Sequence, residues 1–280
     1  FRCDVGDAVP IDFWVEAVTA CQKVNPELVM INEGTNVEWL RKAFDAGYAA
    51  HWSFTVRGEM VAPEEGAWWA KWSKRQAPLP ARMDVVRRYE AKVPKDVLMF
   101  CFLDNHDTAT DDGERRFDRA LPVEAGNAAF VLMLLRRGLP LIFNGNEIAD
   151  NSLNSFFGPV EHAARAARTV DWARALQPAG QKRLALVRTL VKMRHEDPIW
   201  SEGEMEWVTD GEAQGVVAFV RTLGARRVLV AANLTASPAA FTPGALKPTP
   251  RAKRLLAEGF EVRADGTCSV EPYGFAALEL

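Results

Sequence analysis

The sequence predicts an α/β fold built on a parallel sheet, followed by a small all-β domain. Three observations support this prediction. First, unbroken apolar segments alternate with helical patterns over residues 1–199, as in folds built from strand–helix units. Second, several apolar segments lead directly into polar or acidic residues, and the carboxyl ends of parallel strands share one rim. Third, the hydrophobic period falls from helical to two in residues 200–280.

The clearest strand is Val97–Leu103, which consists of seven apolar residues in a row. An apolar segment without a polar break is typical of a strand that is buried on both faces. The residues Asp104-Asn105-His106-Asp107 follow at once. This strand should therefore deliver titratable side chains to the rim of the sheet.

Four further segments complete the predicted parallel sheet. They are residues 1–5, 28–31, 49–54 and 139–143. Acidic residues stand at or shortly after the ends of three of these segments, namely Asp4, Glu33 and Glu147. Because helical patterns separate most of the strands, the strands should run parallel and their polar ends should meet on one rim.

Five helices are predicted from apolar residues at helical spacing. They cover residues 12–21, 37–44, 83–91, 125–137 and 181–195. Thr35 or Asn36 can cap the second helix, and Gly47 suits the left-handed position after its end. Residues 56–82 and 111–119 have weaker patterns and are predicted to form loops at the rim.

The last part of the chain predicts a small all-β sandwich domain over residues 200–280. Gly215–Thr222 and Val228–Leu234 alternate with a period of two and flank Leu223-Gly224-Ala225, which is a hairpin signal. Shorter strand patterns follow at residues 260–262, 267–270 and 275–280. The domain boundary is placed between residues 199 and 200, where the helical pattern ends.

Residues 1–199 predict a (β/α)8 TIM-type barrel that lacks its N-terminal strands, with about strands 4–8 present. A closed barrel of this type needs eight parallel strands. A doubly wound open sheet is the alternative, but it predicts a glycine-rich phosphate-binding loop, and the sequence has none. The chain starts inside a strand pattern without an initiator Met, so we expect that its true N-terminus lies upstream.

Composition argues against several classes of partner. The chain has 280 residues, of which 48% are hydrophobic and 25% charged, and its net charge is −3 without a basic stripe, which argues against nucleic acid. No apolar segment approaches the roughly 20 residues that span a membrane. The four cysteines form no Cys-x-x-Cys pair. Free thiols weakly favour the cytoplasm, but an absent N-terminus would hide a targeting signal.

Asp4, Glu33 and Asp107 stand at the ends of three predicted strands, so they should face one another across the rim. Glycoside hydrolysis needs such an array, because one carboxylate attacks the anomeric carbon and a second gives its proton to the leaving oxygen. The nucleophile must stay ionised, and Arg2 lies two residues from Asp4 on the same strand face. A single Asp near a strand end is more often a turn residue, and only the three together favour catalysis.

Three segments resemble motifs of the α-amylase family, glycoside hydrolase family 13. They are Phe1-Arg2-Cys3-Asp4, Ile31-Asn32-Glu33 and Phe102-Leu103-Asp104-Asn105-His106-Asp107, in the family's order. The resemblance places them at the ends of the fourth, fifth and seventh barrel strands. Residues 138–147 resemble the eighth strand, and residues 231–234 and 272–275 resemble parts of the family's C-terminal domain.

The resemblance implies a retaining hydrolase that acts on α-glucosidic bonds of starch-like α-glucans or maltooligosaccharides. It makes Asp4 the nucleophile that forms a glycosyl-enzyme, Glu33 the general acid/base, and Asp107 the carboxylate that holds sugar hydroxyls. Arg2 would hold Asp4, and His106 would hydrogen-bond the sugar. The chemistry needs no cofactor. The family's first motif, which often supplies a calcium ligand, is not in this sequence, so a structural calcium is possible but its ligands cannot be assigned.

Other interpretations stay open beside this one. A transglycosylating member of the family, such as a glucanotransferase or branching enzyme, would keep the same carboxylates, whereas a non-catalytic sugar-binding relative would be expected to lose one. His106-Asp107 could belong to a metal-dependent phosphohydrolase, but the other histidines are too few for such a site. Trp68, Trp69 and Trp72 could stack on sugar rings, although packing is the commoner role of tryptophan.

Three further expectations can be compared with a structure or an assay. Asp104, Asn144 and Glu147 should be hydrogen-bonding groups of the rim rather than catalysts. The carboxyl groups of Asp4 and Glu33 should be about 5–5.5 Å apart, as in retaining enzymes. Residues 1–280 alone should be inactive, because a barrel of five strands leaves two open edges. The oligomeric state cannot be predicted.

Overall fold

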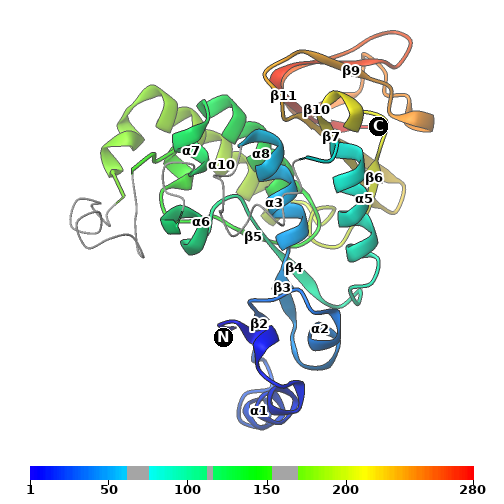
Figure 1. Cartoon of the computed structure of the whole chain (residues 1–280). Coiled ribbons are helices and arrows are strands. Elements are labelled where there is room, and N and C mark those ends of the chain that lie inside the picture. Colours follow the sequence, from blue (N-terminus) through cyan, green and yellow to red (C-terminus); the bar gives the residue numbers. More distant parts are fainter. Residues whose placement is uncertain (62–75, 112–115, 153–169) are drawn as a thin grey trace.

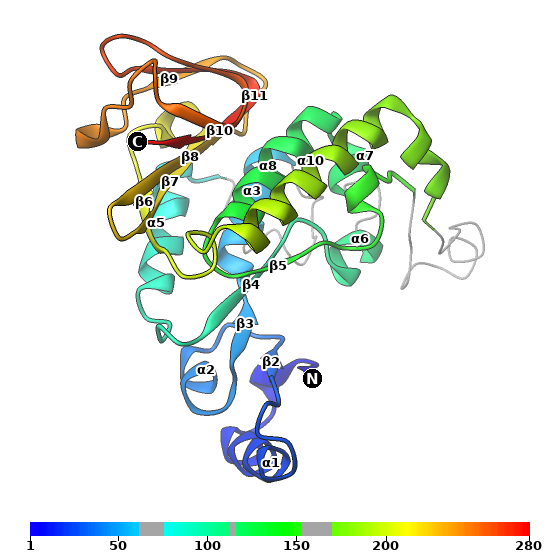
Figure 2. The same ribbon diagram turned by 180° about the vertical axis from the view of Figure 1, so that it is seen from behind.

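A computed structural model describes residues 1–61, 76–111, 116–152 and 170–280. Two sheets organise these residues (Figures 1 and 2): a parallel sheet of five strands and an antiparallel sheet of six. The parallel sheet has the strand order β1-β2-β3-β4-β5, which is the order of the chain. The predicted parallel sheet of the first part and the antiparallel pairing of the last part are therefore confirmed.

The parallel sheet alternates with helices as the sequence pattern predicts. Its strands are β1 (Arg2–Cys3), β2 (Ile31–Asn32), β3 (Ala46–Tyr48), β4 (Leu98–Phe102) and β5 (Leu139–Leu141). The intervening helices are α1 (Ile11–Val24), α2 (Val37–Ala43), α3 (Ala50–Met60), α5 (Leu79–Glu90), α6 (His106–Asp111), α7 (Phe117–Ala120) and α8 (Val123–Leu135). Helix α10 (Pro178–Glu196) follows β5. Short 3-10 turns η1 (Gly6–Ala8), η3 (Asn146–Ile148) and η4 (Trp172–Leu176) lie in the connections.

The prediction of a strand at residues 49–54 is wrong, because the strand is β3 and helix α3 begins at Ala50. Trp52, Phe54 and Val56 of α3 are all buried. A short helix that is buried on most sides has the same apolar pattern as a buried strand, so periodicity cannot separate the two. Gly47 lies within β3 rather than after a helix, and a Cβ at this position would collide with Leu40 of α2.

The two predicted rim loops contain more helix than expected. Helix α3 continues to Met60 and α5 begins at Leu79, so both ends of the segment 56–82 are helical. Helices α6 and α7 occupy most of the described part of the segment 106–120. The three tryptophans Trp68, Trp69 and Trp72 lie outside the described residues.

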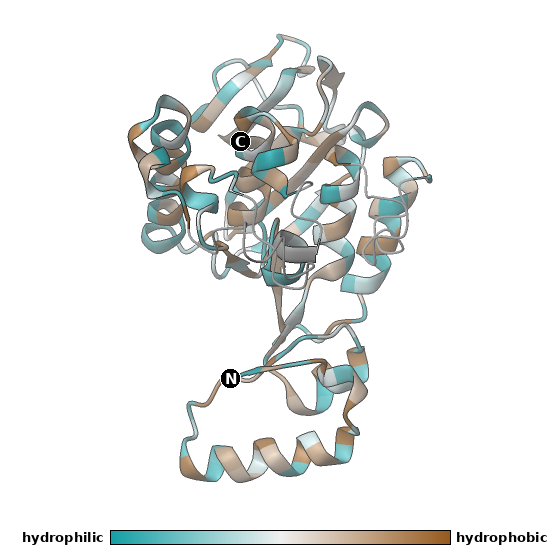
Figure 3. Ribbon diagram, turned by 60° about the vertical axis from the view of Figure 1, so that its left-hand side comes forward, coloured by the Kyte–Doolittle hydropathy of each residue, from teal (hydrophilic) through white to brown (hydrophobic). Residues whose placement is uncertain are grey.

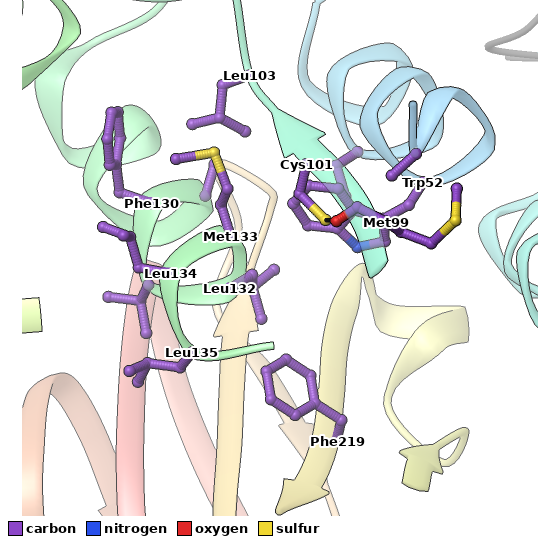
Figure 4. Packing of buried hydrophobic residues seen from close by; sticks show 14 of the residues in the cluster. Trp52, Met99, Cys101, Leu103, Phe130, Leu132, Met133, Leu134, Leu135 and Phe219 are labelled. Carbon is purple, nitrogen blue, oxygen red and sulfur yellow. Dashed lines mark hydrogen bonds between the residues drawn. The ribbon is translucent and has the colours of Figure 1, made fainter. Parts of the chain in front are cut away.

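Helix α8 packs between the parallel sheet and the antiparallel sheet. Every residue from Ala125 to Leu135 is buried, so the helix is covered around its whole circumference, which explains why its sequence is apolar all round. Its side chains share one hydrophobic cluster with Met99 and Cys101 of β4 and with Phe219 of the antiparallel sheet (Figure 4). The helix packs directly on the antiparallel strands β8 (Arg226–Asn233) and β11 (Cys268–Glu279).

The antiparallel sheet has the order β10-β11-β8-β7-β6, with β9 paired to β11. The remaining strands are β6 (Glu204–Val208), β7 (Val216–Leu223), β9 (Ala239–Phe241) and β10 (Lys253–Val262), and the turns η5 (Glu212–Gln214) and η6 (Gly244–Leu246) lie between them. Strands β7 and β8 form the predicted hairpin around Gly224, whose φ is 58°. All six strands belong to one hydrogen-bonded sheet, with register shifts in β10. A sandwich has two sheets, so the predicted sandwich is not confirmed.

Strand β7 explains how this single sheet is buried on both faces. Val217 and Phe219 belong to the hydrophobic cluster that contains α8. Val216 and Ala218 belong to a second cluster, which is formed by residues of the antiparallel sheet itself. Successive residues of a strand face opposite sides, so both clusters need apolar residues. This accounts for the buried apolar residues from Val216 to Val220.

Helix α1 is the least covered of the described helices (Figure 3). Val18 is its one buried residue, whereas Phe13 is 55% and Val24 is 88% exposed. Phe1 and Val29, beside the parallel sheet, are also exposed. In the described part of the chain, no strand pairs with the outer side of β1.

Two simpler expectations concern cysteines and membranes. All four cysteines are free; Cys21 is exposed, and the other three are buried. Among the described helices, none is both long and apolar enough to cross a bilayer.

A buried ion pair fastens α10 to the helices beside it. Arg183 donates to both carboxylate oxygens of Asp118, at 3.0 and 2.7 Å, and to Asn127 Oδ1 at 2.5 Å. Both charged residues are almost completely removed from water. Burial raises the pKa of Asp118 above its ordinary value, and the charge of Arg183 opposes this rise. A Cβ on Gly126 of α8 would collide with the guanidinium, so α8 and α10 are in close contact here.

We predict that Arg183→Met will lower the free energy of unfolding by about 3–5 kcal/mol, because it leaves the Asp118 carboxylate buried without a cation. Urea unfolding measures the change. Arg188→Met, at an exposed position of the same helix, is the control and should stay within about 0.5 kcal/mol. Adding Asp118→Asn to Arg183→Met should recover part of the loss. A loss no larger than that of the control would contradict the role given to this pair.

Candidate active site

A cavity of about 700 Å³ lies at the carboxyl ends of strands β1 to β4. Four acidic side chains line it: Asp4, Asp7, Glu33 and Asp107. Three of these are the carboxylates that the sequence analysis selects, and His106 lines the cavity beside them. The structure thus brings together residues that are up to about a hundred positions apart in the chain, because parallel strands present their carboxyl ends on one side.

The guanidinium of Arg2 lies at the centre of this group. Its Nη1 donates to Asp4 Oδ1 at 2.5 Å, and its Nη2 forms an ion pair with Glu33 Oε1. The same Nη2 is 3.4 Å from Nε2 of His106. Burial by itself would lower the pKa of Arg2, but Tyr48, Asp4 and Glu33 outweigh this effect and raise the pKa, so the guanidinium stays charged.

The carboxylates occupy different environments. The side chain of Asp4 is 75% exposed, whereas that of Glu33 is 17% exposed. Glu33 Oε2 also accepts a hydrogen bond of 2.8 Å from the backbone N–H of Val5. Asp107 Oδ1 lies 3.3 Å from His106 Nε2. The three acids are therefore distinct in exposure and in partners, as groups with different chemical roles need to be.

Aromatic rings form the apolar side of the cavity. Tyr48, Phe54 and Phe102 line it, and the rings of Tyr48 and Phe54 lie 5.5 and 5.6 Å from that of Phe102. The guanidinium carbon of Arg2 is 5.9 Å from the Tyr48 ring centre. Burial raises the pKa of the Tyr48 phenol, and Arg2 partly opposes this shift. The cavity thus offers an apolar surface next to a group of charges, which suits a ligand with both apolar and hydroxyl-bearing faces.

Asp104 is a hydrogen-bonding group, as the sequence analysis expects, but its side chain is completely buried and does not line the cavity. It accepts hydrogen bonds from Arg57 Nη1 at 2.8 Å, from Asn146 Nδ2 at 3.1 Å and from the N–H of Phe117. The burial of Asp104 could not be predicted from the apolar residues before it, because its hydrogen-bond partners come from distant segments. Asp104 therefore anchors the loop after β4 below the cavity.

Asn144 and Glu147 are also not among the residues that line the cavity. Asn144 is exposed. The carboxylate of Glu147 accepts the backbone N–H of Gly145 at 2.9 Å, within its own turn.

Asp7 is the cavity residue that the sequence analysis missed. Its Oδ1 accepts a hydrogen bond from Asn32 Nδ2 at 2.8 Å, and its Oδ2 accepts the backbone N–H groups of Thr35 and Asn36 at 2.8 and 3.1 Å. The position of Asp7, three residues after Asp4 in the same loop, is the signal that could have found it.

The cavity does not fit a calcium ion. Glu33, His106 and Asp107 have ligand atoms within 4.8 Å of one another, the one such group found in the described ranges. Calcium takes six to eight oxygen ligands, whereas this group includes an imidazole and adjoins the cation of Arg2, which is paired with Glu33. We assign no metal to these residues.

No protein-family model matches this sequence, and no curated protein matches it significantly in sequence. Solved structures do match its fold. A maltogenic α-amylase from Thermotoga neapolitana is 20% identical with a TM-score of 0.70, and the match covers 100% of this chain and 61% of that one. The debranching enzyme of Nostoc punctiforme is 18% identical with a TM-score of 0.72, covering 100% and 57%. An α-amylase from Geobacillus thermoleovorans, complexed with acarbose, is 17% identical with a TM-score of 0.71, covering 99% and 59%.

At these identities the comparisons establish the fold. The chain spans less than two thirds of the length of each of these three structures, and almost all of its own length is matched. The α-amylase-type fold that the three sequence motifs predict is confirmed.

Proposed function

We propose that this chain is part of a retaining glycoside hydrolase that cleaves α-glucosidic bonds in starch-like α-glucans or maltooligosaccharides. The observation that carries the proposal is the group formed by Asp4, Glu33 and Asp107 around Arg2 in one cavity. The likeness of the fold to α-amylases and to a debranching enzyme supports the same class of substrate.

In this proposal Asp4 attacks the anomeric carbon while Glu33 gives its proton to the glycosidic oxygen. The bond between sugar and leaving group breaks, and a bond from Asp4 to the sugar forms. Glu33 then takes a proton from water, whose oxygen displaces Asp4 and restores the free carboxylate. Two inversions leave the configuration at the anomeric carbon unchanged.

The surroundings of each residue support these roles. Arg2 Nη1 donates a hydrogen bond of 2.5 Å to Asp4 Oδ1 and so holds the carboxylate that would attack the sugar. The side chain of Glu33 is 17% exposed and that of Asp4 is 75% exposed, so the two carboxylates have the different surroundings that two different roles need. Asp107 and His106 lie next to Glu33, with ligand atoms of the three residues within 4.8 Å of one another, where they would hold sugar hydroxyls.

A transglycosylating enzyme would use the same three carboxylates and differ in the acceptor that displaces Asp4. A non-catalytic sugar-binding protein is less well supported, because Asp4, Glu33, Asp107 and Arg2 are all present and grouped. Product analysis separates these alternatives.

We also infer that the parallel sheet is about strands 4–8 of a (β/α)8 barrel, within a first domain of residues 1–199, and that residues 200–280 form a second domain. The exposed apolar residues Phe1, Phe13 and Val29, which lie before β1, in α1 and before β2, support this inference, because exposed apolar surface and the unpaired edge of β1 call for further strands and helices to cover them. The greater length of the similar structures agrees with it.

We predict that β1 and α1 exchange amide hydrogens slowly in the active protein and rapidly in residues 1–280 expressed alone, since only the former would cover the outer side of β1. Hydrogen–deuterium exchange with mass spectrometry measures this difference. The antiparallel strands β7 and β8 serve as the internal control and should be protected in both. A chain of residues 1–280 that is monodisperse, protected at β1 and active would contradict the inferred barrel.

We predict that the active protein hydrolyses maltooligosaccharides or starch and releases the α-anomer first, because two displacements at the anomeric carbon retain its configuration. Proton NMR of the first products identifies the anomer, and chromatography identifies longer products of transfer. Initial release of the β-anomer would rule out Asp4 as a nucleophile. Pullulan and sucrose, offered in parallel, define the bond and substrate that the enzyme accepts.

We predict that Asp4→Asn and Glu33→Gln fail in different ways. Asp4→Asn removes the nucleophile and should lower kcat on the order of 10⁴-fold or more on every substrate. Glu33→Gln removes the proton donor, so an aryl glycoside with a good leaving group should still give a burst of glycosyl-enzyme. Asp12→Asn, exposed on α1, is the control. If Glu33→Gln lost rate equally on activated and natural substrates, Glu33 would not be the acid.

A further inference from the structure

The loops that follow β1 and β2 exchange hydrogen bonds in both directions. The backbone N–H of Val5, in the first loop, donates to Glu33 Oε2 in the second at 2.8 Å. In return, the backbone N–H groups of Thr35 and Asn36, in the second loop, donate to Asp7 Oδ2 in the first at 2.8 and 3.1 Å. Each loop thus supplies a carboxylate to the backbone of the other.

Asp7 holds the second loop on both sides of Glu33. Asn32, the residue before Glu33, donates from Nδ2 to Asp7 Oδ1 at 2.8 Å, and its side chain is completely buried. Thr35 and Asn36, which follow Glu33 in the chain, donate their backbone N–H groups to Asp7 Oδ2. Both oxygens of Asp7 are therefore engaged by the segment that carries Glu33.

Two glycines allow the loops to approach this closely. A Cβ on Gly6 would collide with the side-chain amide of Asn32, and a Cβ on Gly34 would collide with the carboxylate of Asp7. Val5, between Asp4 and Gly6, has φ 45° and ψ 40°. This left-handed conformation is unfavourable for a β-branched residue by about 1–3 kcal/mol and persists only where the surroundings impose it.

The second loop has further supports besides its contacts with the first loop. The hydroxyl of Tyr89 donates to the carbonyl of Thr35 at 2.9 Å, and the N–H of Tyr48 donates to the carbonyl of Gly34 at 3.2 Å. These contacts fix the second loop to α5 and β3. They do not connect it to the loop of Asp4. That connection is made by Asp7, by the Val5–Glu33 bond, by Arg2, which pairs with both Asp4 and Glu33, and by the N–H of Glu33, which donates to the carbonyl of Cys3 at 3.0 Å.

We propose that Asp7 is a positioning residue that sets the separation of Asp4 and Glu33. The inference rests on the proposed function, in which those two carboxylates act at the same bond. A retaining mechanism needs them about 5–5.5 Å apart, and a displacement of about 1 Å can cost on the order of 10²-fold in rate. Asp7 does this by tying the loop of the nucleophile to the loop of the acid/base.

The test compares Asp7→Ala with Asp12→Ala in the active protein. Both residues lie in the first turn of a helix after β1, so the control removes a similar charge from a nearby place. Asp7→Ala should lower kcat on the natural glucan by about 10²-fold with KM changed less than about threefold. The loss should be smaller on an aryl glycoside with a good leaving group, because that substrate depends less on a well-placed Glu33. Asp12→Ala should change neither value.

The conservative variant Asp7→Asn keeps the test decisive if Asp7→Ala does not fold. Its amide oxygen can still accept the N–H groups of Thr35 and Asn36, but its NH₂ would face the NH₂ of Asn32. We therefore expect an intermediate loss, of about tenfold in kcat, with the same preference for activated substrates. Equal losses on natural and activated substrates in both variants would overturn the proposal, because a general structural defect affects all substrates alike.

Hydrogen exchange supplies a readout that does not depend on activity. The amides of Thr35 and Asn36 should exchange faster in Asp7→Ala than in the unmodified protein, and those of Asp12→Ala should not change. Unchanged exchange at both amides would overturn the proposed link. If the unmodified protein cleaves no glucan, the proposed function fails, and the exchange result alone then shows whether Asp7 holds the loop.

Discussion

The structure of the rim depends on a carboxylate that has no contact with water, that of Asp104. A buried charge is tolerated only when it is paired and hydrogen-bonded, and Asp104 meets this need with Arg57 of α3, Asn146 of η3 and the N–H of Phe117. These partners come from three segments that are far apart in the chain. Arg116 extends the network by pairing with the buried Asp150 at 2.9 Å. These contacts link Asp104, Arg116 and Phe117 after β4 to Asn146 and Asp150 after β5. Asp104 stands two residues before His106 in the chain, so the start of the segment that carries His106 and Asp107 is fixed by this network.

Above this network the charge balance of the cavity is negative. Asp4, Asp7, Glu33 and Asp107 line it, and Arg2 is the cation that contacts two of them. An excess of carboxylates in a partly enclosed space repels anions, so a neutral sugar fits this cavity better than a phosphorylated one. The aromatic rings of Tyr48, Phe54 and Phe102 complete a surface that has both apolar and hydrogen-bonding parts. These features agree with the α-glucan substrate proposed above.

The sequence predicted the parts of the fold that follow from local pattern. Strand β4 and the β7–β8 hairpin lie where their apolar periods indicate, and Asp4, Glu33 and Asp107 meet because each ends a parallel strand. Helix α3 could not be predicted, because the buried residues Trp52 and Phe54 belong to a segment whose apolar pattern fits a strand and a helix equally well. The roles of Asp104 and Asp7 were also out of reach, since both depend on partners that only the tertiary structure brings near. A single polar residue next to an apolar strand does not reveal whether it faces solvent or a buried arginine.

The burial of α8 on all sides has a consequence for how the chain reaches this structure. Its cover comes from the parallel sheet, from helix α10, and from the strands β8 and β11, which lie well after it in the chain. The hairpin β7–β8 forms between neighbouring segments of the chain, since Leu223 pairs with Arg226. The pairing of β3 with β4 instead joins distant segments, since Ala46 pairs with Leu98. Long connections close slowly. During synthesis, we therefore expect part of the apolar surface of α8 to stay uncovered until β11 has been made, and a surface of this kind is prone to aggregation.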